Sequence, residues 1–394
     1  MGLFDRVVGN LEERRDRVLS GKINCIPCPF PRFRSEWSGI EQGRYYGVTA
    51  QQKVGKTKLA NYMFLFHPLL YAMQHPNELR VKFFYISLEM SEEELYQQFI
   101  CHLLYIVSRG QHRFSPKELK STDKENPIAP EILAIIRSDE YKAYFEFFDS
   151  HVEIISSIRN PTGINKLMRD YARANGTQYK KIINFKDNKT GEITPTEVDS
   201  HYIANDPDEY VIIITDHISL IQPESGMTLK DSMTKLSSDY FVGVRNKYRY
   251  IPVVIQQQAI AGESTDNIKL GKLKPSVADL GESKILSRDY NVLFGLFSPY
   301  RHEMHDYMGY SIDKFRDNAR FMEIIISREG GGGTTCPLYF DGAIDYFREL
   351  PLPFEVAKLK QVYDVVNVIQ TAKPKIVLHF FKVIINNIKN IKNV

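Results

Sequence analysis

Seven apolar runs of strand length, separated by longer helical patterns, constrain the fold of this chain more than any other feature. The runs are rich in β-branched and aromatic residues and are close to continuously apolar. Such runs are typical of strands buried on both faces, as in a parallel sheet covered by helices. We therefore predict an α/β domain of roughly 300 residues with a mainly parallel central sheet and helices on both faces. The runs lie at residues 45–50, 81–88, 152–158, 210–216, 250–257, 291–297 and 321–327.

The segment before these runs, residues 1–37, contains a helical pattern without an obvious core of its own. Apolar residues recur at helical spacing among arginines and glutamates, which predicts an amphipathic helix over residues 3–19. A proline-rich connector follows the helix. The apolar positions are Leu3, Val7, Leu11 and Val18.

The central domain is expected to span residues 38–350 and to carry two surface insertions. The first, at about residues 110–135, is polar and rich in lysine and proline. The second covers residues 177–208, where the sequence Asn-Lys-Thr-Gly at 188–191 predicts the turn of a hairpin between short strands. Residues 351–394 are expected to form a helical C-terminal extension. Its second helical pattern has an apolar stripe beside lysines, and we favour packing on protein over a membrane surface.

Composition excludes several classes of protein. Lysine and arginine (51) nearly balance aspartate and glutamate (48), so bulk charge provides no grip on nucleic acid or anionic lipid. The longest apolar stretch, residues 62–73, is too short to span a bilayer, so we expect a cytoplasmic protein without a membrane partner. Cys25 and Cys28 form a CxxC pair, but a second pair that would complete a zinc site is missing.

The most informative local motif is an eight-residue phosphate-loop pattern with alanine at its first position in place of glycine. It directly follows a predicted strand and directly precedes a helical run, which is the context that the motif requires. Backbone N–H groups around Gly55 would bind phosphates, Lys56 would reach the β- and γ-phosphates, and the Thr57 hydroxyl would hold Mg²⁺. We therefore predict ATP and Mg²⁺ as ligands. The loop consists of Ala50, Gln51, Gln52, Lys53, Val54, Gly55, Lys56 and Thr57.

Two carboxylates follow predicted strands. Asp216 ends the run 210–216, which suits the acidic residue that holds Mg²⁺ at the carboxyl edge of a parallel sheet. Glu89 follows the run 81–88 and has two possible roles: to orient or deprotonate an attacking water, or to cap the helix that begins nearby. The spacing alone leaves these two roles equal.

Taken together, these segments resemble the RecA-fold ATPase core of DnaB-type replicative helicases. The sequence FYISLEM at 84–90 is similar to the family's FSLEM segment, which implies that Glu89 is the catalytic base. The sequence IIITDHISLI resembles the second nucleotide motif of the family. The sequence IPVVIQQQ resembles the strand that ends in a nucleotide-sensing glutamine, and by register this residue is Gln258. Further blocks lie in the family's order at residues 152–176, 276–289 and 323–330.

The resemblance also implies a residue that acts on a neighbouring subunit. The last block of the family carries a lysine and an arginine that reach the neighbour's γ-phosphate, whereas here Arg328 is followed by Glu329 and four glycines. The resemblance therefore implies Arg328 as the arginine finger in trans, with only one cation in the block, or else an absent finger. Ala261 replaces the arginine that the family has after the sensing glutamine.

A ring-shaped homohexamer that acts on single-stranded DNA is implied by the same resemblance. The segment from Ala259 to Pro275 lies near the position of the family's central DNA-binding loop. The helix over 3–19 is similar to a linker helix that docks on the adjacent subunit, and the alternative is that it folds back on its own domain. The family's N-terminal primase-binding domain is not expected here. Candidate DNA contacts in the loop are Lys269, Lys272 and Lys274.

The leading functional hypothesis is an ATP-hydrolysing DNA helicase that moves along single-stranded DNA in replication, with other replication-fork proteins as expected partners. One alternative is a RecA- or RadA-like recombination ATPase, although the sequence shows no N-terminal polymerisation strand. Another is a structural or regulatory ATPase with a degenerate arginine finger. The short N-terminus and the abundance of lysine, isoleucine and asparagine suit a phage protein of the host cytoplasm.

Overall fold

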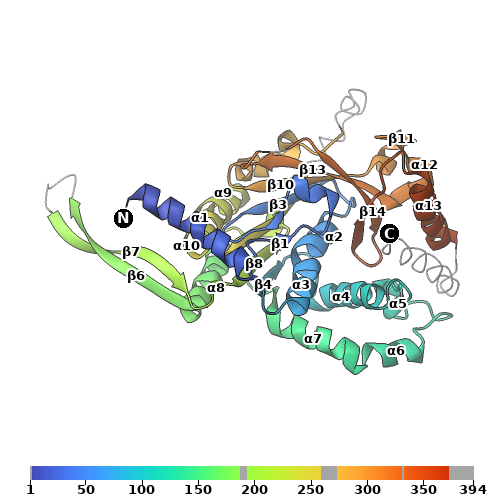
Figure 1. The fold of residues 1–394 in the computed structure, drawn as a ribbon, viewed down its shortest axis with the longest axis horizontal. Helices are drawn as coiled ribbons and strands as arrows, with labels where there is room; N and C mark the ends of the chain where they lie inside the picture. Colours follow the sequence, from blue (N-terminus) through green and yellow to red (C-terminus); the bar gives the residue numbers. More distant parts are fainter. Residues whose placement is uncertain (1, 187–192, 259–272, 331, 372–394) are drawn as a thin grey trace.

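A nine-stranded sheet forms the centre of the molecule (Figure 1). The structure, a computed structural model, describes residues 2–186, 193–258, 273–330 and 332–371. From one edge of the sheet to the other, the strands are β15 (Tyr346–Glu349), β14 (Thr335–Asp341), β13 (Ala319–Ser327), β10 (Val292–Phe297), β3 (Tyr46–Ala50), β9 (Ile251–Gln257), β8 (Glu209–Asp216), β4 (Arg80–Ser87) and β5 (Val152–Ile155).

Six strands, from β10 to β5, run parallel to one another, and this confirms the predicted mainly parallel sheet. All seven apolar runs fall on strands. The run at 321–327 differs from the others because β13 pairs antiparallel with β10, and β14 and β15 extend the sheet in antiparallel fashion. The chain between β10 and β13 contains only short elements and no long crossover helix, which an antiparallel connection does not require.

Both faces of the sheet are buried, as the apolar runs predicted. Along β8, Ile212 and Ile214 belong to one apolar cluster, whereas Val211 and Ile213 belong to the other. Successive side chains of a strand point to opposite faces, so a strand covered on both sides must be apolar at every position. The first cluster packs against α2 (Lys56–Asn61), a π-helical segment (Tyr62–Phe66), α3 (His67–Gln74), α4 (Glu92–Val107) and α7 (Asp139–His151). The second packs against α8 (Pro161–Ala174), α9 (Leu229–Thr234) and α10 (Val242–Tyr248).

Smaller elements complete the domain. The polar insertion at about 110–135 contains one short helix and the start of a second. A third apolar cluster, which includes Phe315 and Val366, joins the segment after β10 to the C-terminal helix. The second helical pattern of the C-terminal extension lies outside the described residues. The elements are β1 (Ile26–Pro27), β2 (Gly39–Ile40), α5 (Pro116–Leu119), α6 (Pro130–Ile136), β11 (Asp306–Tyr307), β12 (Tyr310–Ser311), α12 (Ile312–Phe315) and α13 (Val356–Thr371).

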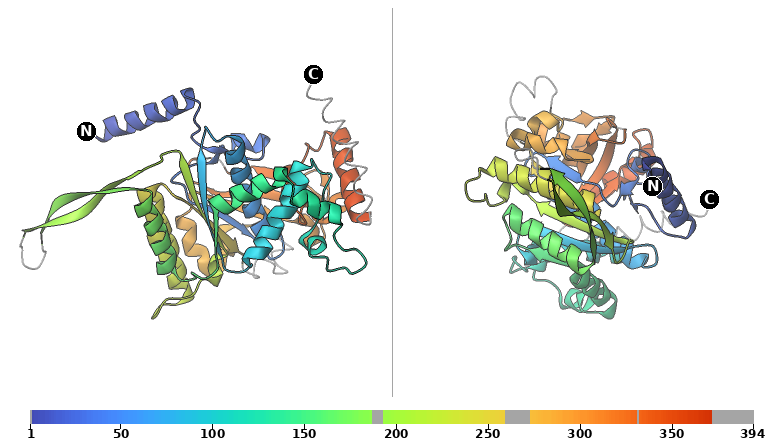
Figure 2. Two further views of the ribbon diagram at one scale, coloured as in Figure 1. Left: turned by 90° about the horizontal axis from the view of Figure 1, so that it is seen from below. Right: turned by 90° about the vertical axis from the view of Figure 1, so that its left-hand side faces the viewer.

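A long two-stranded hairpin projects from the domain between α8 and β8 (Figures 1 and 2). Its strands, β6 (Gly176–Lys186) and β7 (Ile193–Ala204), pair antiparallel along their whole length. The predicted hairpin is confirmed, but its strands have 11 and 12 residues and are not short. The turn expected at 188–191 lies outside the described residues.

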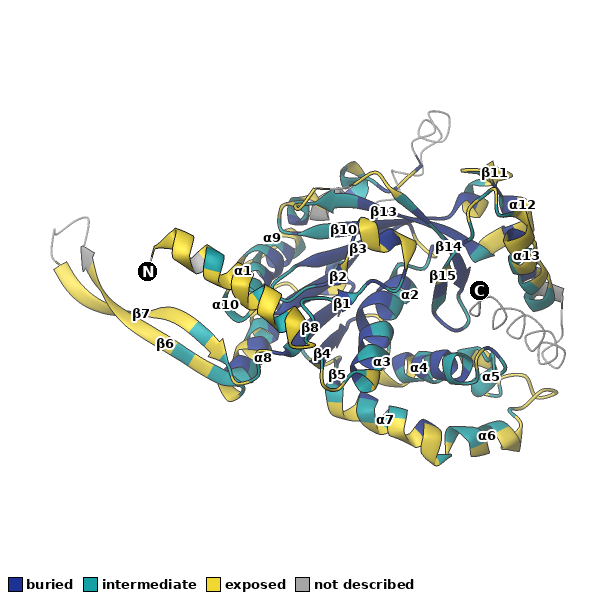
Figure 3. Ribbon diagram, in the orientation of Figure 1, coloured by how far each residue is buried: buried dark blue, intermediate teal, exposed yellow. Residues whose placement is uncertain are grey.

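The N-terminal helix α1 (Leu3–Leu19) is confirmed, and it extends from the same side of the molecule as the hairpin (Figure 2). Most of its surface is exposed (Figure 3). Six of its apolar side chains are between 49% and 77% exposed and do not pack on its own domain, and docking on an adjacent subunit stays a prediction. The residues concerned are Leu3, Phe4, Val7, Leu11, Val18 and Leu19.

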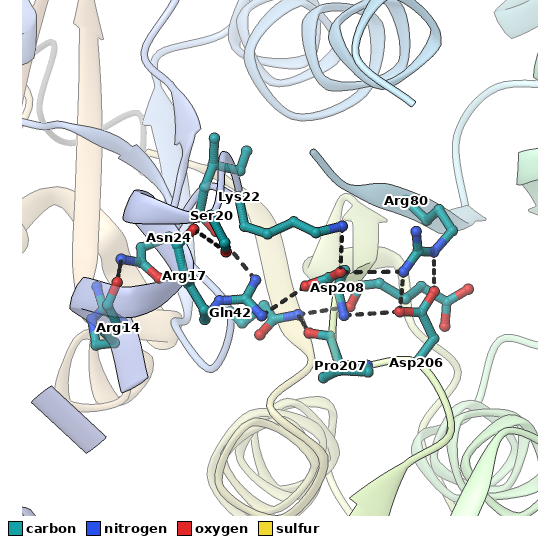
Figure 4. Close-up of polar contacts among 12 residues, drawn as sticks. Arg14, Arg17, Ser20, Lys22, Asn24, Gln42, Arg80, Asp206, Pro207 and Asp208 are labelled. Atoms are coloured by element: carbon teal, nitrogen blue, oxygen red, sulfur yellow. Dashed lines mark hydrogen bonds and ion pairs between the residues drawn. The ribbon is translucent and has the colours of Figure 1, made fainter. Parts of the chain in front are cut away.

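The C-terminal end of α1, by contrast, is tied to the domain by ion pairs (Figure 4). Arg17 and Lys22 contact the Asp208 carboxylate at 2.7 and 2.9 Å, and Arg14 contacts Glu41 at 2.9 Å. Asp208 lies directly before β8, so the helix is attached at the amino edge of the parallel strands. Among the helices of the described ranges, none has the length and apolar character that a bilayer crossing demands.

Candidate active site

The phosphate-loop motif lies at the carboxyl edge of the sheet, between the end of β3 and the start of α2. The strand, loop and helix therefore follow one another as predicted. Gly55 has a φ of 106°, a left-handed conformation that strains any residue with a Cβ atom. A Cβ atom at this position would also lie 3.1 Å from the Phe340 ring. The first helical residue is Lys56, so the N–H groups of the first turn face the end of the loop.

Asp216 and Thr57 lie in contact, as the predicted Mg²⁺ site requires. The Thr57 hydroxyl donates to Asp216 Oδ1 at 3.1 Å, and the Tyr85 hydroxyl lies 3.3 Å from Oδ2. Burial raises the pKa of Asp216 to about 6, against the opposing effects of Lys56 and of these hydroxyls; Glu89 raises it further. The carboxylate is only 1% exposed. A buried carboxylate of this kind is stabilised by a cation, and its oxygens are hard ligands that suit Mg²⁺.

Glu89 lies at the same edge, two residues after the end of β4. The helix-capping role is wrong, because the N-cap of α4 is Ser91, whose hydroxyl accepts from the Glu94 N–H. The Glu89 carboxylate is 53% exposed and lies 3.7 Å from His217 Nε2. Burial and Lys56 lower the pKa of His217, whereas Glu89 raises it. The role of catalytic base stays a prediction. The exposed carboxylate is accessible to a water molecule.

Gln258 follows β9 beside the start of the phosphate loop. Its backbone N–H donates to the Ala50 carbonyl at 3.1 Å. Its side chain is buried, and within the described ranges its Nε2 atom has no hydrogen-bond partner. Two residues earlier, the Gln256 side chain accepts from the Tyr290 hydroxyl at 2.9 Å. Among the described residues, the buried Nε2 of Gln258 is thus left without a partner next to the loop.

Arg328 lies at the opposite, amino edge of the sheet. Ser327 pairs with Val292, which in turn pairs with Tyr46 at the start of β3, whereas the phosphate loop follows the end of that strand. The five residues of β3 separate the two edges by roughly 15 Å. The structure therefore does not bring Arg328 to the phosphate loop of its own chain. Its guanidinium donates to the backbone carbonyls of Tyr290, at 2.9 Å, and Arg288.

Two further arginines lie near Arg328, and the sequence reasoning placed neither of them there. Arg44, from the segment before β3, forms an ion pair with Glu329. Arg245 donates to the carbonyl of Asp289 at 3.1 Å, and burial together with Arg328 lowers its pKa. The last block therefore has one cation in sequence but a group of three arginines in space. Only the pairing of distant segments reveals this group.

Of the three predicted DNA contacts, Lys269 and Lys272 lie outside the described residues. Lys274 is exposed and forms an ion pair with Glu323. The Lys274 ammonium also lies 5.8 Å from the centre of the Tyr307 ring. The structure does not place this lysine with the other predicted site residues.

A network of polar side chains supports the first turn of α2, and the sequence analysis did not single it out. The Tyr85 hydroxyl donates to Asn61 Oδ1 at 3.0 Å, which links the network to Asp216. Lys58 contacts the fully buried Asp345 at 2.5 Å. Arg320, from β13, donates to the Val54 carbonyl in the phosphate loop at 2.7 Å. Apart from a tyrosine within one apolar run and an arginine directly before another, the sequence contains no signal for these contacts.

The fold is similar to that of two solved structures. One is an ATPase domain, with a TM-score of 0.61 and 16% identity over 89% of this chain and 100% of that chain. The other is a DnaB-like replicative helicase described with its interactions with primase; it has a TM-score of 0.58 and 16% identity over 89% of this chain and 67% of that chain. No family model and no curated protein sequence matches the chain. At this identity the likeness shows the fold alone, and this fold agrees with the predicted α/β domain built around a mainly parallel central sheet.

Proposed function

We propose that this protein is an ATP-hydrolysing helicase of the DnaB-like type that moves along single-stranded DNA. The observation that carries the proposal is the assembly of one site at the carboxyl edge of the sheet. The phosphate loop, the contact between Thr57 and Asp216, and the exposed Glu89 all lie there, although they come from three different strands. Phosphoryl transfer needs this combination of a phosphate cradle, a metal-binding carboxylate and a group that orients water.

ATP and Mg²⁺ fit the residues of this site. The loop amides and Lys56 would bind the phosphates, and Thr57 and Asp216 would hold Mg²⁺. The fit rests on the buried Asp216 carboxylate, whose partners are hydroxyl groups and the nearby Lys56 charge. When bound, Mg²⁺ would supply positive charge that offsets the negative charge on the β- and γ-phosphates.

Glu89 is the proposed general base. Its carboxylate would accept the proton of the attacking water as the water adds to the γ-phosphorus in line with the leaving oxygen. His217 Nε2 lies 3.7 Å from this carboxylate, beyond hydrogen-bond distance, and burial lowers the pKa of His217, which favours a neutral imidazole beside the base. The buried amide of Gln258 would sense the γ-phosphate from β9.

We propose that Arg328 acts in trans. Because this arginine lies at the amino edge, it would complete the phosphate site of a second copy, and a ring-shaped homohexamer is one closed arrangement that does so. Arg44 and Arg245 lie beside it and would add positive charge to the same surface. The exposed apolar side of α1, held at its base by the ion pairs at Asp208, would dock on the adjacent subunit.

Single-stranded DNA would run through the centre of such a ring, near the segment that contains Lys274. The net charge of +3 gives no general attraction for DNA, so DNA would be bound by a local group of basic side chains. Replication-fork proteins are further proposed partners, and a phage origin and a location in the host cytoplasm remain proposals.

One observation favours a second candidate, a structural or regulatory ATPase with slow turnover. The guanidinium of Arg328 is bound to backbone carbonyls of its own chain, and Glu329 pairs with Arg44. If these contacts persist in the assembly, the finger does not reach the γ-phosphate, and ATP serves to hold subunits together.

The decisive experiment measures ATP hydrolysis with and without single-stranded DNA. The wild type, Lys56→Ala and the remote surface variant Lys142→Ala are compared. We expect DNA to stimulate the wild type and Lys142→Ala, and Lys56→Ala to be inactive. A wild-type rate that DNA leaves unchanged would favour the structural ATPase, and normal hydrolysis by Lys56→Ala would refute both proposals.

A further inference from the structure

We infer that Arg320 is a positioning residue of the nucleotide site, and that it sets the direction of a phosphate-binding amide by holding the Val54 carbonyl. The inference rests on the proposed ATPase function and adds a residue that the motif does not contain. Arg320 lies on β13, more than 260 residues after the phosphate loop, and it is completely buried. It touches no reacting group, so it would act only through the loop.

The contact determines the orientation of one peptide unit. Arg320 Nε donates to the Val54 carbonyl oxygen at 2.7 Å. In a trans peptide, the carbonyl of one residue and the N–H of the next point in opposite directions. Binding the Val54 carbonyl toward β13 therefore turns the Gly55 N–H away from β13, to the side where the loop is to hold phosphate. Without this bond, the flexible peptide before Gly55 is free to rotate.

The remaining nitrogens of Arg320 also donate hydrogen bonds. Nη1 donates to the carbonyls of Asp317 and Ala319, both at 2.8 Å, and Nη2 donates to Asp317 Oδ1 at 2.9 Å. With all three nitrogens bound to the protein, the guanidinium is held in one orientation. Burial lowers the pKa of Arg320 to about 10, and Asp317 partly restores it, so the side chain remains charged at neutral pH.

Phe340 gives the loop a second support from the same region. The guanidinium of Arg320 lies 4.5 Å from the centre of the Phe340 ring, a cation–π contact. The same ring approaches Gly55 so closely that a Cβ atom there would lie 3.1 Å from it. Arg320 and Phe340 belong to β13 and β14, the antiparallel part of the sheet. This part therefore forms a platform beneath residues 54 and 55.

Because β13 runs antiparallel to β10, the two ends of β13 lie at opposite edges of the sheet. Arg320 lies near the beginning of this strand, at the carboxyl edge of the parallel strands, and Arg328 follows its end, at the amino edge. Eight residues of strand, about 27 Å, separate them. One strand thus supports the phosphate loop of its own subunit and carries the arginine proposed to act on the next. A displacement of β13 would affect both sites.

The test compares full-length wild type with Arg320→Met and Arg320→Lys. Arg113→Met is the control, because Arg113 forms a largely buried ion pair with Asp341 of β14, at 2.6 Å. That pair makes no contact with the phosphate loop within the described ranges. Each protein is examined for its melting temperature without nucleotide, for the Kd of a fluorescent ADP analogue, and for the KM and kcat of ATP hydrolysis.

We expect Arg320→Met to raise the Kd and the KM at least about 10-fold, the effect of one lost hydrogen bond to a charged group. Arg320→Lys should recover part of the affinity, since the lysine ammonium retains the positive charge but not the planar set of donors of a guanidinium. Arg113→Met should lower the melting temperature yet change the Kd less than about 2-fold. If Arg320→Met does not fold, Arg320→Lys and Phe340→Leu take its place.

The inference is overturned if the Arg320 variants and Arg113→Met lose melting temperature alike and bind the ADP analogue as the wild type does. Arg320 would then be a structural residue only. Failure of the proposed function looks different, because the wild type itself would neither bind the analogue nor hydrolyse ATP.

Discussion

Replacing Asp216 with asparagine should stabilise the nucleotide-free protein at neutral pH while abolishing hydrolysis. In the folded protein, burial raises the pKa of this carboxyl from 3.8 to about 6. At 1.36 kcal/mol for each pKa unit, ionisation of Asp216 costs the folded state about 3 kcal/mol. We expect the wild type to retain this carboxyl group, although its ionisation is destabilising, because the charge binds a cation during function.

The sign of the effect follows from the direction of the shift. Because the folded pKa lies above the unfolded value, the stabilising contribution of the protonated carboxyl is complete below pH 3.8. It is lost as the pH rises through about 6. Asparagine does not titrate, so the stability of the Asp216→Asn variant does not fall over this pH range. Asparagine also disturbs one hydrogen bond, to Thr57 or Tyr85, at a cost of about 1 kcal/mol.

The net gain of Asp216→Asn is therefore about 2 kcal/mol above pH 7, and it vanishes or reverses in acid. For a domain of this size, the gain corresponds to a melting temperature higher by on the order of 3 °C. The assay is calorimetry from pH 5 to pH 8, without nucleotide or Mg²⁺, with the exposed Asp239→Asn as control. A difference between Asp216→Asn and wild type that stays constant across this range would refute the reasoning.

Two further predictions concern the chemical step. Glu89→Gln should bind the fluorescent ADP analogue as the wild type does but hydrolyse ATP at least ~100-fold more slowly, because the amide accepts no proton; a loss below about 5-fold, measured at saturating ATP, would remove Glu89 from the role of base. Arg328→Ala should also retain nucleotide binding and lose DNA-stimulated hydrolysis by on the order of 100-fold. Mixing it with Lys56→Ala should restore part of the activity, since one subunit supplies the loop and the other the arginine; mixtures as inactive as their components would contradict action in trans.

Much of the fold was predictable because its signals are local. Strands such as β8 are buried on both faces and are therefore apolar at consecutive positions, which the sequence displays directly. The amphipathic pattern of α1 and the turn residues of the hairpin are equally local. The antiparallel direction of β13 was not predictable, because an apolar run has the same appearance in either direction.

The candidate site likewise contains residues that local sequence patterns predict and residues that these patterns do not assign. The phosphate loop and Asp216 could be predicted because motif and strand ending occur within a few residues, and the structure brings Thr57 and Asp216 into contact. For Glu89, the residues left two roles equal, and the structure removed one by placing Ser91 at the N-cap of α4. The roles of Arg328 and Gln258 came from the resemblance and stay predictions.

The sequence by itself determined which segments form strands and where the phosphate-loop motif lies, since hydrophobic periodicity and loop motifs act over neighbouring residues. Only the tertiary structure decided which side chains from distant segments meet. Arg320 lies beneath the loop at Val54, and Arg44 joins Arg328 at the opposite edge, because strand order and strand direction place them there. Strand order depends on contacts between residues hundreds of positions apart, and no local pattern in one sequence records those contacts.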